Sequence, residues 1–416
     1  TAGPEMISPE RAPVGGMPGR STAFFWNIRS EISSTFSTGD LASRLVAAPE
    51  DAGSDALLSR EELSAAAADG YQVQSGWWTG LDSKLALGWR GGLVSLDLHG
   101  TLLARYAPGG FSDQSGIALA PGELGVRITR FPADWQNGRL RVELGRMRLR
   151  DPSGVIVSQL VDGAGFGVRF PRLYVELRGG TTALVNKYYY TPRFPGEGTV
   201  YREPARYLAS DRLIALSSLQ AADVFGQDLG LSVVYFDDRE VASGGDQWYA
   251  GLSGRGVLAR IPGVLEELAH STHVALQLEA SGTVGFSAGL DLTARTSAIP
   301  LQAALLTSYA SGAAGHAAPY VPVSPRAVGR VLALPRSGLL ETTLHLTGTT
   351  GTRFQPMLDT KIVIEPGDAA PWVGAELLAG FTYRPLADLR LEVAAGAAES
   401  ALGWTPHFSM EGALQL

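Results

Sequence analysis

The charged residues of this chain are grouped by sign along the sequence, a pattern that could act on solutes through an electric field. Ten arginines occur between residues 127 and 178, at positions 127, 130, 139, 141, 146, 148, 150, 169, 172 and 178. The same stretch contains five acids, Asp134, Glu143, Asp151, Asp162 and Glu176. Later in the chain, the charged residues predicted to point inward are mostly acidic, namely Glu279, Asp291, Glu341, Asp359, Glu365, Glu376 and Glu392. If the two groups face each other, they orient dipolar solutes and disfavour apolar ones; the alternative is that they only pair with neighbours and fill space.

The sequence lacks the residue arrangements typical of enzymes. The six histidines form no HExxH motif, and only His270 and His273 lie close together. No GxSxG motif, phosphate loop or dinucleotide fingerprint occurs in a strand–turn–helix context. The chain has no cysteine, which excludes disulfides, thiolate metal sites and cysteine nucleophiles. We therefore expect a protein that is not an enzyme and needs no cofactor.

One segment, EDAGSDALLSREEL, has the spacing of a degenerate calcium-binding loop. Its oxygen ligands, at loop positions one, five, nine and twelve, would be Asp51, Asp55, Ser59 and Glu62. Position three is Gly53 instead of an acid, and position six is Ala56 where the sharp turn requires glycine. A capping box, with Ser59 as N-cap and Glu62 three residues later, accounts for the same residues. We favour a short helix over residues 60–69 and predict no metal site.

The charged residues sit on segments that alternate between apolar and polar side chains. In LVSLDLHGTLLARY (93–106), Val94, Leu96 and Leu98 alternate with polar residues that include Asp97 and His99. Period two predicts a β-strand with one apolar and one polar face. About eighteen such segments follow one another, approximately at 22–37, 79–90, 93–106, 117–131, 138–149, 163–170, 172–180, 212–220, 229–238, 246–258, 272–282, 284–296, 299–310, 338–348, 356–366, 372–383, 388–398 and 404–416.

The length of these segments and of their connections favours a membrane barrel over a soluble sandwich. Soluble strands average about five or six residues, whereas membrane strands need about nine to eleven. The apolar faces carry almost no charge at mid-strand, as contact with lipid requires. Three long connections (39–78, 181–211 and 311–337) fall at one end of the strands, and most short ones fall at the other.

Because a sheet in hydrocarbon cannot leave an edge unpaired, it must close. We predict an all-β fold, a closed antiparallel transmembrane β-barrel of about 18 strands with short periplasmic turns and long outer loops. Sixteen strands is the alternative, because the hairpins at 163–180 and 272–296 are short. Residues 22–416 would form this single barrel, and residues 1–21, rich in Pro and Gly, an extended strap or plug. A net charge of −7 argues against nucleic-acid binding, and Trp and Tyr near strand ends, such as Trp248 and Tyr235, suit a membrane interface.

In this pattern the chain resembles bacterial outer-membrane β-barrels of the wide, porin-like type. The resemblance implies a place in the bacterial outer membrane, with the lipid bilayer, the barrel-assembly machinery and a small hydrophilic solute as partners; an oligomer or another envelope partner remains open. One departure is the C-terminal residue, Leu416, where such barrels usually end in an aromatic residue; the last aromatic here is Phe408.

The expected function is a porin-like channel for passive diffusion of small hydrophilic solutes. The alternatives are a transporter of hydrophobic substrates with an N-terminal hatch, or a plugged barrel that acts as a surface or assembly scaffold. The side chains predicted to line the pore are Asp97, His99, Arg105, Glu123, Arg127, Arg139, Arg141, Glu143, Arg169, Glu176, Arg178, Glu279, Asp291, Arg295, Glu341, His345, Asp359, Lys361, Glu376 and Glu392.

Overall fold

Backbone hydrogen bonds join eighteen strands into one antiparallel sheet that closes on itself in the computed structural model, counting the described residues. The structure describes residues 23–40, 74–91, 94–107, 116–130, 138–185, 208–239, 246–296, 300–312, 318–324, 338–348, 353–366, 372–400 and 403–415. Within these ranges it describes the backbone alone for residues 23–125, 129–130, 400, 403, 405 and 415.

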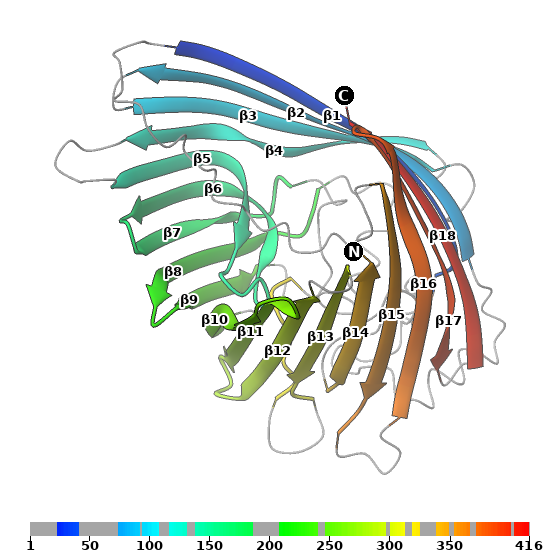
Figure 1. Ribbon diagram of the computed structural model, residues 1–416. Helices are drawn as coiled ribbons and strands as arrows, with labels where there is room; N and C mark the ends of the chain where they lie inside the picture. The colour runs from blue at the N-terminus through cyan, green and yellow to red at the C-terminus, as the bar shows by residue number, and fades with distance from the viewer. Residues whose placement is uncertain are drawn as a thin grey trace.

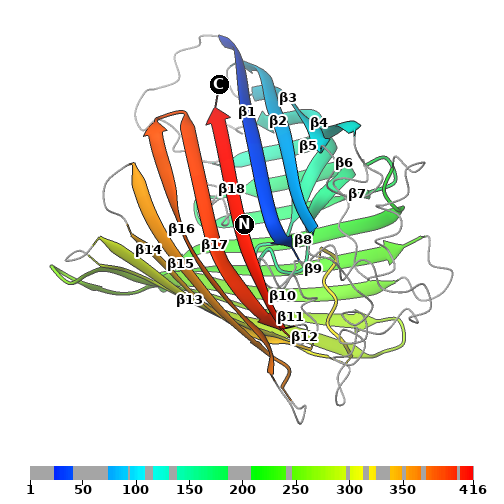
Figure 2. The same ribbon diagram turned by 90° about the vertical axis from the view of Figure 1, so that its right-hand side faces the viewer.

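The strands follow one another around the barrel in chain order (Figures 1 and 2). They are Ala23–Asp40 (β1), Gln74–Gly91 (β2), Val94–Ala107 (β3), Gly116–Arg130 (β4), Arg139–Arg150 (β5), Ser158–Arg169 (β6), Leu173–Thr181 (β7), Arg212–Val224 (β8), Gln227–Asp238 (β9), Gln247–Ile261 (β10), Leu265–Glu279 (β11), Val284–Thr296 (β12), Leu301–Ala310 (β13), Leu340–Gly348 (β14), Phe354–Ile364 (β15), Trp372–Leu386 (β16), Leu389–Ser400 (β17) and Gly403–Gln415 (β18).

Closure depends on the pairing of the first strand with the last. Strand β1 is bonded to β2 on one side and to β18 on the other, so that Phe36 is opposite both Trp77 and Met410. Each of the eighteen strands therefore has two neighbours. The predicted fold class and the count of eighteen strands are confirmed, and the alternative of sixteen strands is wrong.

Most strand boundaries lie within a few residues of the prediction, with three larger differences. Strand β2 begins at Gln74, five residues before the predicted 79. Strand β11 begins at Leu265, seven residues before the predicted 272, because two of its first outward positions, His270 and Thr272, are polar and so give no apolar alternation. Strand β6 begins at Ser158 where 163 was predicted, because its first residues belong to a hairpin that leaves the barrel wall.

The two faces of the sheet have different compositions. On β11, Val274, Leu276 and Leu278 are about half exposed, whereas Ala275 and Gln277 between them are buried. The buried apolar side chains of β5, β8, β9, β10, β11 and β13 belong to one cluster. Strands this far apart in the ring can share a cluster only across the inside of the barrel. The buried face is therefore the inner face, and the exposed apolar side chains form the outer face.

The connections divide the barrel into two different ends. Strands β7 and β8 are joined by residues 182–211, and β13 and β14 by residues 311–339. At the opposite end, β8 and β9 are joined by Phe225 and Gly226 alone. One connection at the first end is an exception, because β11 and β12 are joined by the short turn of residues 280–283. We call these the long-connection end and the short-connection end. In the described part of the chain, no helix has the length and apolar character needed to cross a membrane.

The exposed apolar outer face gives a first prediction. Leu252 lies near the middle of β10 and is 56% exposed. If this face meets hydrocarbon, Leu252→Arg should lower the free energy of unfolding in lipid vesicles by about 2–4 kcal/mol. Ser271→Arg, on the inner face of β11, is the matched control and should cost much less. Equal losses for both variants in urea titrations would contradict the assignment of the faces.

Candidate functional site

A cluster of arginines surrounds one buried glutamate on the inner face of β4, β5 and β7. Glu143 is 3% exposed. Its carboxylate lies 3.0 Å from Arg127 Nη2, 2.7 Å from Arg141 Nη2 and 3.7 Å from Arg178 Nη2. Strand pairing brings these residues together, because Arg127 is opposite Glu143 and Arg141 is two positions away on the same face. A single carboxylate cannot neutralise three guanidinium groups.

One further ion pair extends this basic wall, which we define as the inner face of β4–β7, and a second lies at the base of the hairpin formed by β5 and β6. Arg178 pairs with Glu176 on β7, and Arg146 Nη2 lies 2.8 Å from Asp162 Oδ2. Among the described side chains, the wall combines five arginines (127, 139, 141, 169 and 178) with two carboxylates (143 and 176), an excess of three positive charges. Arg127 and Arg141 keep about one third of their side-chain surface exposed, so their guanidinium groups remain accessible from the lumen.

The remaining predicted arginines of this wall lie nearer the short-connection end. Arg139 and Arg169 are directly opposite each other on β5 and β6. The guanidinium carbon of Arg169 lies 5.8 Å from the centre of the Tyr174 ring, within the range of a cation–π contact. Both arginines share the inner face with Arg141, because they occupy positions of the same parity in paired strands.

An acidic wall occupies the inner face of β14–β18. Lys361 pairs with Glu341, and His345 Nδ1 with Asp359. The second ring nitrogen of His345 lies 2.6 Å from the Thr347 hydroxyl. Arg390 Nη2 lies 2.8 Å from Glu411 Oε1. The inward charged residues of these strands are Glu341, Asp359, Glu376, Glu392 and Glu411 against Lys361 and Arg390.

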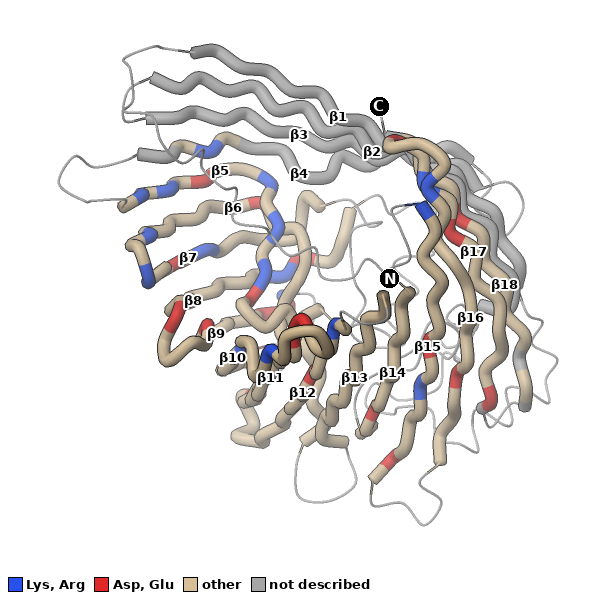
Figure 3. The backbone as a smooth tube through the Cα atoms, in the orientation of Figure 1, with Lys and Arg blue, Asp and Glu red and all other residues tan. Residues whose placement is uncertain are grey.

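Closure of the sheet sets the two walls opposite each other. In a ring of eighteen strands, β5 and β14 are nine places apart, as are β7 and β16. Figure 3 shows arginine positions on β5–β7 and acidic positions on β14–β17 on the two sides of the barrel. The other predicted charges whose side chains the structure describes lie between the walls: Glu279 on β11, and Asp291 and Arg295 on β12.

The hairpin formed by β5 and β6 leaves the wall and bends into the barrel (Figure 1). Strand β5 pairs with β4 only up to Arg146, and β6 pairs with β7 only from Asp162. Beyond these points the hairpin pairs with itself. Its base is a pair of glycines, Gly145 opposite Gly163. Gly145 has φ of 114°, a value that favours glycine, and a Cβ on Gly163 would lie 1.9 Å from the Gly179 carbonyl oxygen.

The tip of the hairpin is organised by one buried carboxylate. Asp151, 1% exposed, accepts hydrogen bonds from the backbone N–H groups of Ser153, Gly154, Ile156 and Val157, at 2.8–3.0 Å. These bonds satisfy backbone donors of a turn that would otherwise be buried without partners. Asp151 therefore fixes the shape of the tip.

The hairpin packs against the inner face of β8–β10. Met147, Leu149 and Ile156 join Ile214 and Phe236 in the buried cluster. Two of the wall positions that the tip touches are glycines. A Cβ on Gly230 would lie 2.8 Å from Pro152 Cβ, and one on Gly251 would lie 2.8 Å from Ile156 Cδ1. The apolar patch inside the barrel is thus covered by the hairpin, and the hairpin's other face presents Arg148.

A segment from the connection between β13 and β14 secures the hairpin from the long-connection end. The Ser158 N–H donates to Ser324 Oγ at 3.0 Å, and the Ser324 N–H donates to the Ile156 carbonyl at 3.2 Å. The same segment, residues 318–324, is held to the wall because the Val321 N–H donates to Gln277 Oε1 at 2.7 Å. The Tyr249 hydroxyl in turn donates to the Val321 carbonyl at 2.7 Å.

Sequence reasoning predicted two groups of inward charges but missed the hairpin. Residues 145–162 were expected to be the end of one strand and a connection. Two features of the sequence could have indicated it: the glycine pair at the base and the apolar residues on both arms. Those apolar residues would be left exposed if the hairpin continued the wall, so they favour a hairpin that is buried. Several predictions lie outside the described side chains: those for Asp97, His99, Arg105 and Glu123, the calcium-loop residues Asp51, Asp55, Ser59 and Glu62, the helix at 60–69, the strap at 1–21 and the C-terminal Leu416.

The chain matches no protein-family model and no curated protein by sequence. It is similar in structure to Pseudomonas aeruginosa OccK11 (OpdR), with a TM-score of 0.59, 14% identity and coverage of 94% of this chain and 96% of that one. The outer membrane protein opdK from Pseudomonas aeruginosa gives a TM-score of 0.59 at 10% identity, covering 94% and 98%. Acinetobacter baumannii OccAB3 gives 0.59 at 9% identity, covering 94% and 99%. The resemblance to wide outer-membrane barrels is confirmed as a likeness of fold.

The glycine contact under the hairpin generates a second prediction. In Gly251→Leu, the new side chain should displace Ile156 and loosen the bonds between Ser158 and Ser324. We expect their amide hydrogens to exchange about tenfold faster or more, corresponding to a loss of about 1.4 kcal/mol of local stability. Gly254→Leu, on the outer face of the same strand, should leave both rates unchanged. Unaltered exchange in Gly251→Leu would show that the hairpin does not depend on this contact.

Proposed function

We propose that this protein is an outer-membrane channel through which small hydrophilic solutes diffuse passively along a charge-lined lumen. The observation that carries the proposal is the pair of opposed walls, basic on β4–β7 and acidic on β14–β18, inside a closed barrel with an apolar outer face. The proposal includes a bilayer around the barrel, delivery by barrel-assembly machinery, and no enzymatic activity.

The outer face supports a place in a membrane. Large apolar side chains on successive strands, among them Leu231, Leu252 and Leu377, are about half exposed. A water-soluble protein rarely leaves so extended an apolar surface uncovered. Hydrocarbon covers such a surface without loss, and the closed sheet leaves no backbone edge for it to meet. The match to a protein described as an outer membrane protein points to the same membrane.

The charged walls suggest how the lumen would act on a solute. A solute that enters between them experiences a field directed from the basic wall to the acidic wall. Its negative part is attracted to the accessible guanidinium groups of Arg127 and Arg141, and its positive part to the acidic wall. An apolar solute gains nothing from the field and loses contacts with water. All twenty residues named in the sequence analysis remain our candidates for the pore lining.

The alternative of a hydrophobic-substrate transporter is less well supported. Such a protein needs apolar side chains accessible along the lumen. The apolar cluster of the described inner face, which includes Leu149, Ile214 and Phe236, is buried between hairpin and wall. A measurement of ion flow distinguishes a plugged scaffold, which conducts no ions, from a channel, which does.

Single-channel recording tests the proposed function directly. In planar bilayers we expect steady, ohmic conductance steps from the purified protein, and none from a heat-denatured sample. Replacing residues 151–157 by Gly-Gly should increase the conductance, because it removes the part of the hairpin that reaches furthest into the lumen. Correct insertion without any conductance would reject the channel and favour the scaffold.

Ion selectivity tests the contribution of the basic wall. Arg141→Glu combined with Arg178→Glu changes the charge of the wall by four units. The permeability ratio of potassium to chloride should rise by roughly twofold or more, because cations are then concentrated at that wall. Arg239→Glu, beyond the end of β9 and away from the lumen clusters, is the control. An unchanged reversal potential in the double variant would remove the basic wall from the explanation of selectivity.

A further inference from the structure

One imidazole belongs to the acidic wall, that of His345 on the inner face of β14. Its side chain is 36% exposed, and that of its partner Asp359 is 30% exposed. The two residues are directly opposite each other on β14 and β15. Both groups are therefore accessible to water and ions in the lumen. An imidazole changes its charge between about pH 5 and 8, a range in which carboxylates and guanidinium groups ordinarily keep theirs.

Both ring nitrogens of His345 have partners that suit either protonation state. Nδ1 is paired with the Asp359 carboxylate, which accepts a hydrogen bond from the ring. Nε2 lies 2.6 Å from the Thr347 hydroxyl. A hydroxyl group can donate a hydrogen bond to the neutral ring and accept one from the protonated ring. Protonation therefore adds a positive charge at this position without requiring the ring to move.

The charges around the His345 ring give its titration a large relative effect. The described charged side chains of the inner face that surround it are Glu341 of β14, Asp359 and Lys361 of β15, and Glu376 of β16. On the other side, β13 presents Ala304 opposite His345 and Gln302 opposite Thr347, and neither of these residues titrates. With a neutral ring, this group has an excess of two negative charges. With a protonated ring, the excess is one.

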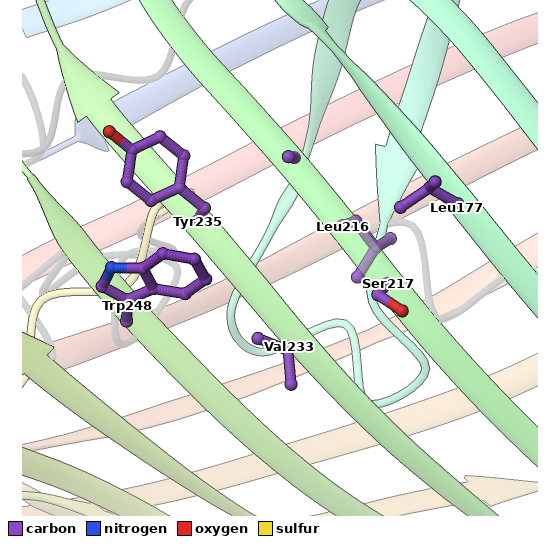
Figure 4. A pocket seen from close by; sticks show the side chains of 7 residues that line it. Leu177, Leu216, Ser217, Val233, Tyr235 and Trp248 are labelled. Carbon is purple, nitrogen blue, oxygen red and sulfur yellow. The ribbon is translucent and has the colours of Figure 1, made fainter.

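The hollow on the outer face, by contrast, is insensitive to pH in this range. Figure 4 shows this depression across β7–β10, with Leu177, Val233 and Trp248 among the residues that line it. None of the side chains that line it ordinarily carries a charge near neutral pH. A surface of this composition suits contact with acyl chains. A change of ion flow with pH would therefore point to the lumen and away from this contact with lipid.

We propose that His345 is a selectivity-determining residue of the lumen, a charge switch that makes the acidic wall sensitive to pH. When the ring is neutral, the Asp359 carboxylate is an uncompensated negative charge that attracts cations. When the ring is protonated, it neutralises Asp359, and the wall attracts cations less. Cationic solutes therefore pass less readily as the surroundings become acidic. The inference rests on the proposed function of the barrel as a channel.

Reversal potentials of the full chain in planar bilayers under a KCl gradient test this role. From about pH 8 to about pH 5.5, the permeability ratio of potassium to chloride should fall by roughly 1.5-fold or more, because the wall loses half of its local excess charge. His345→Gln keeps a hydrogen-bonding side chain that does not titrate, so it should lose more than half of this change. His270→Gln, on the outer face of β11, is the matched control and should keep the wild-type change.

The unitary conductance in concentrated KCl separates a charge switch from a moving gate. Concentrated salt screens the charge of the wall, and the His345 ring keeps its partners in both states. We therefore expect the same conductance step at both pH values. Closure of the channel at the acidic pH would show a conformational change and overturn the charge switch.

Nuclear magnetic resonance of isotope-labelled histidine follows the titration without ion flow. In detergent, the ring resonance that is absent from His345→Gln should shift between about pH 5 and 8. A resonance that does not shift would overturn the inference, and this measurement in the wild-type protein does not depend on a functional variant. If the protein inserts but never conducts, the proposed function itself fails. If it conducts but the permeability ratio is constant with pH, or changes equally in His345→Gln, only the role of His345 is rejected.

Discussion

Pairing of β1 with β18 is the constraint from which the rest of this structure follows. A sheet with two free edges would expose rows of unpaired N–H and C=O groups. A membrane offers these groups no hydrogen-bond partners, and in water they can pair with other chains and cause aggregation. Once the edges are joined, each strand has an inside and an outside. Alternation along every strand then sorts side chains into two environments. The same closure converts two groups of charges, far apart in the sequence, into walls that face one another across the lumen.

The wall is regular, and the interior owes its shape to departures from that regularity. The β5–β6 hairpin abandons its neighbours beyond Arg146 and Asp162 and covers apolar residues of β8–β10. Its position depends on places where side chains are missing, at Gly230 and Gly251 in the wall and at the glycine pair at its base. Charged residues also shape the hairpin. The buried Asp151 holds its tip, and the face of the hairpin turned away from the wall presents arginine. Packing and polarity therefore act together in one element.

The fold was largely predictable from the sequence because period two is a local property. Eighteen strands, their faces and the difference between the two ends all follow from it. The hairpin was not predictable on this basis, because its arms continue the alternation of the wall strands without interruption. What changes at Gly145 is the environment of each face, and that depends on contacts with β9 and β10, which lie far along the chain. The start of β11 was missed for a different reason, because polar residues (His270 and Thr272) occupy outward positions there and the apolar alternation is absent.

The register between the two arms of the β5–β6 hairpin limits how the width of the passage can change during evolution. Residues on the two arms face each other in fixed partners, such as Met147 with Val161 and Leu149 with Gln159. Adding one residue to each arm would lengthen the hairpin by about 3.3 Å. It would also reverse the orientation of every side chain beyond the insertion, so that the apolar and cationic faces of the tip exchange places. Only steps of two per arm preserve both surfaces. Natural variants of this hairpin should therefore differ in length by multiples of four residues, two in each arm.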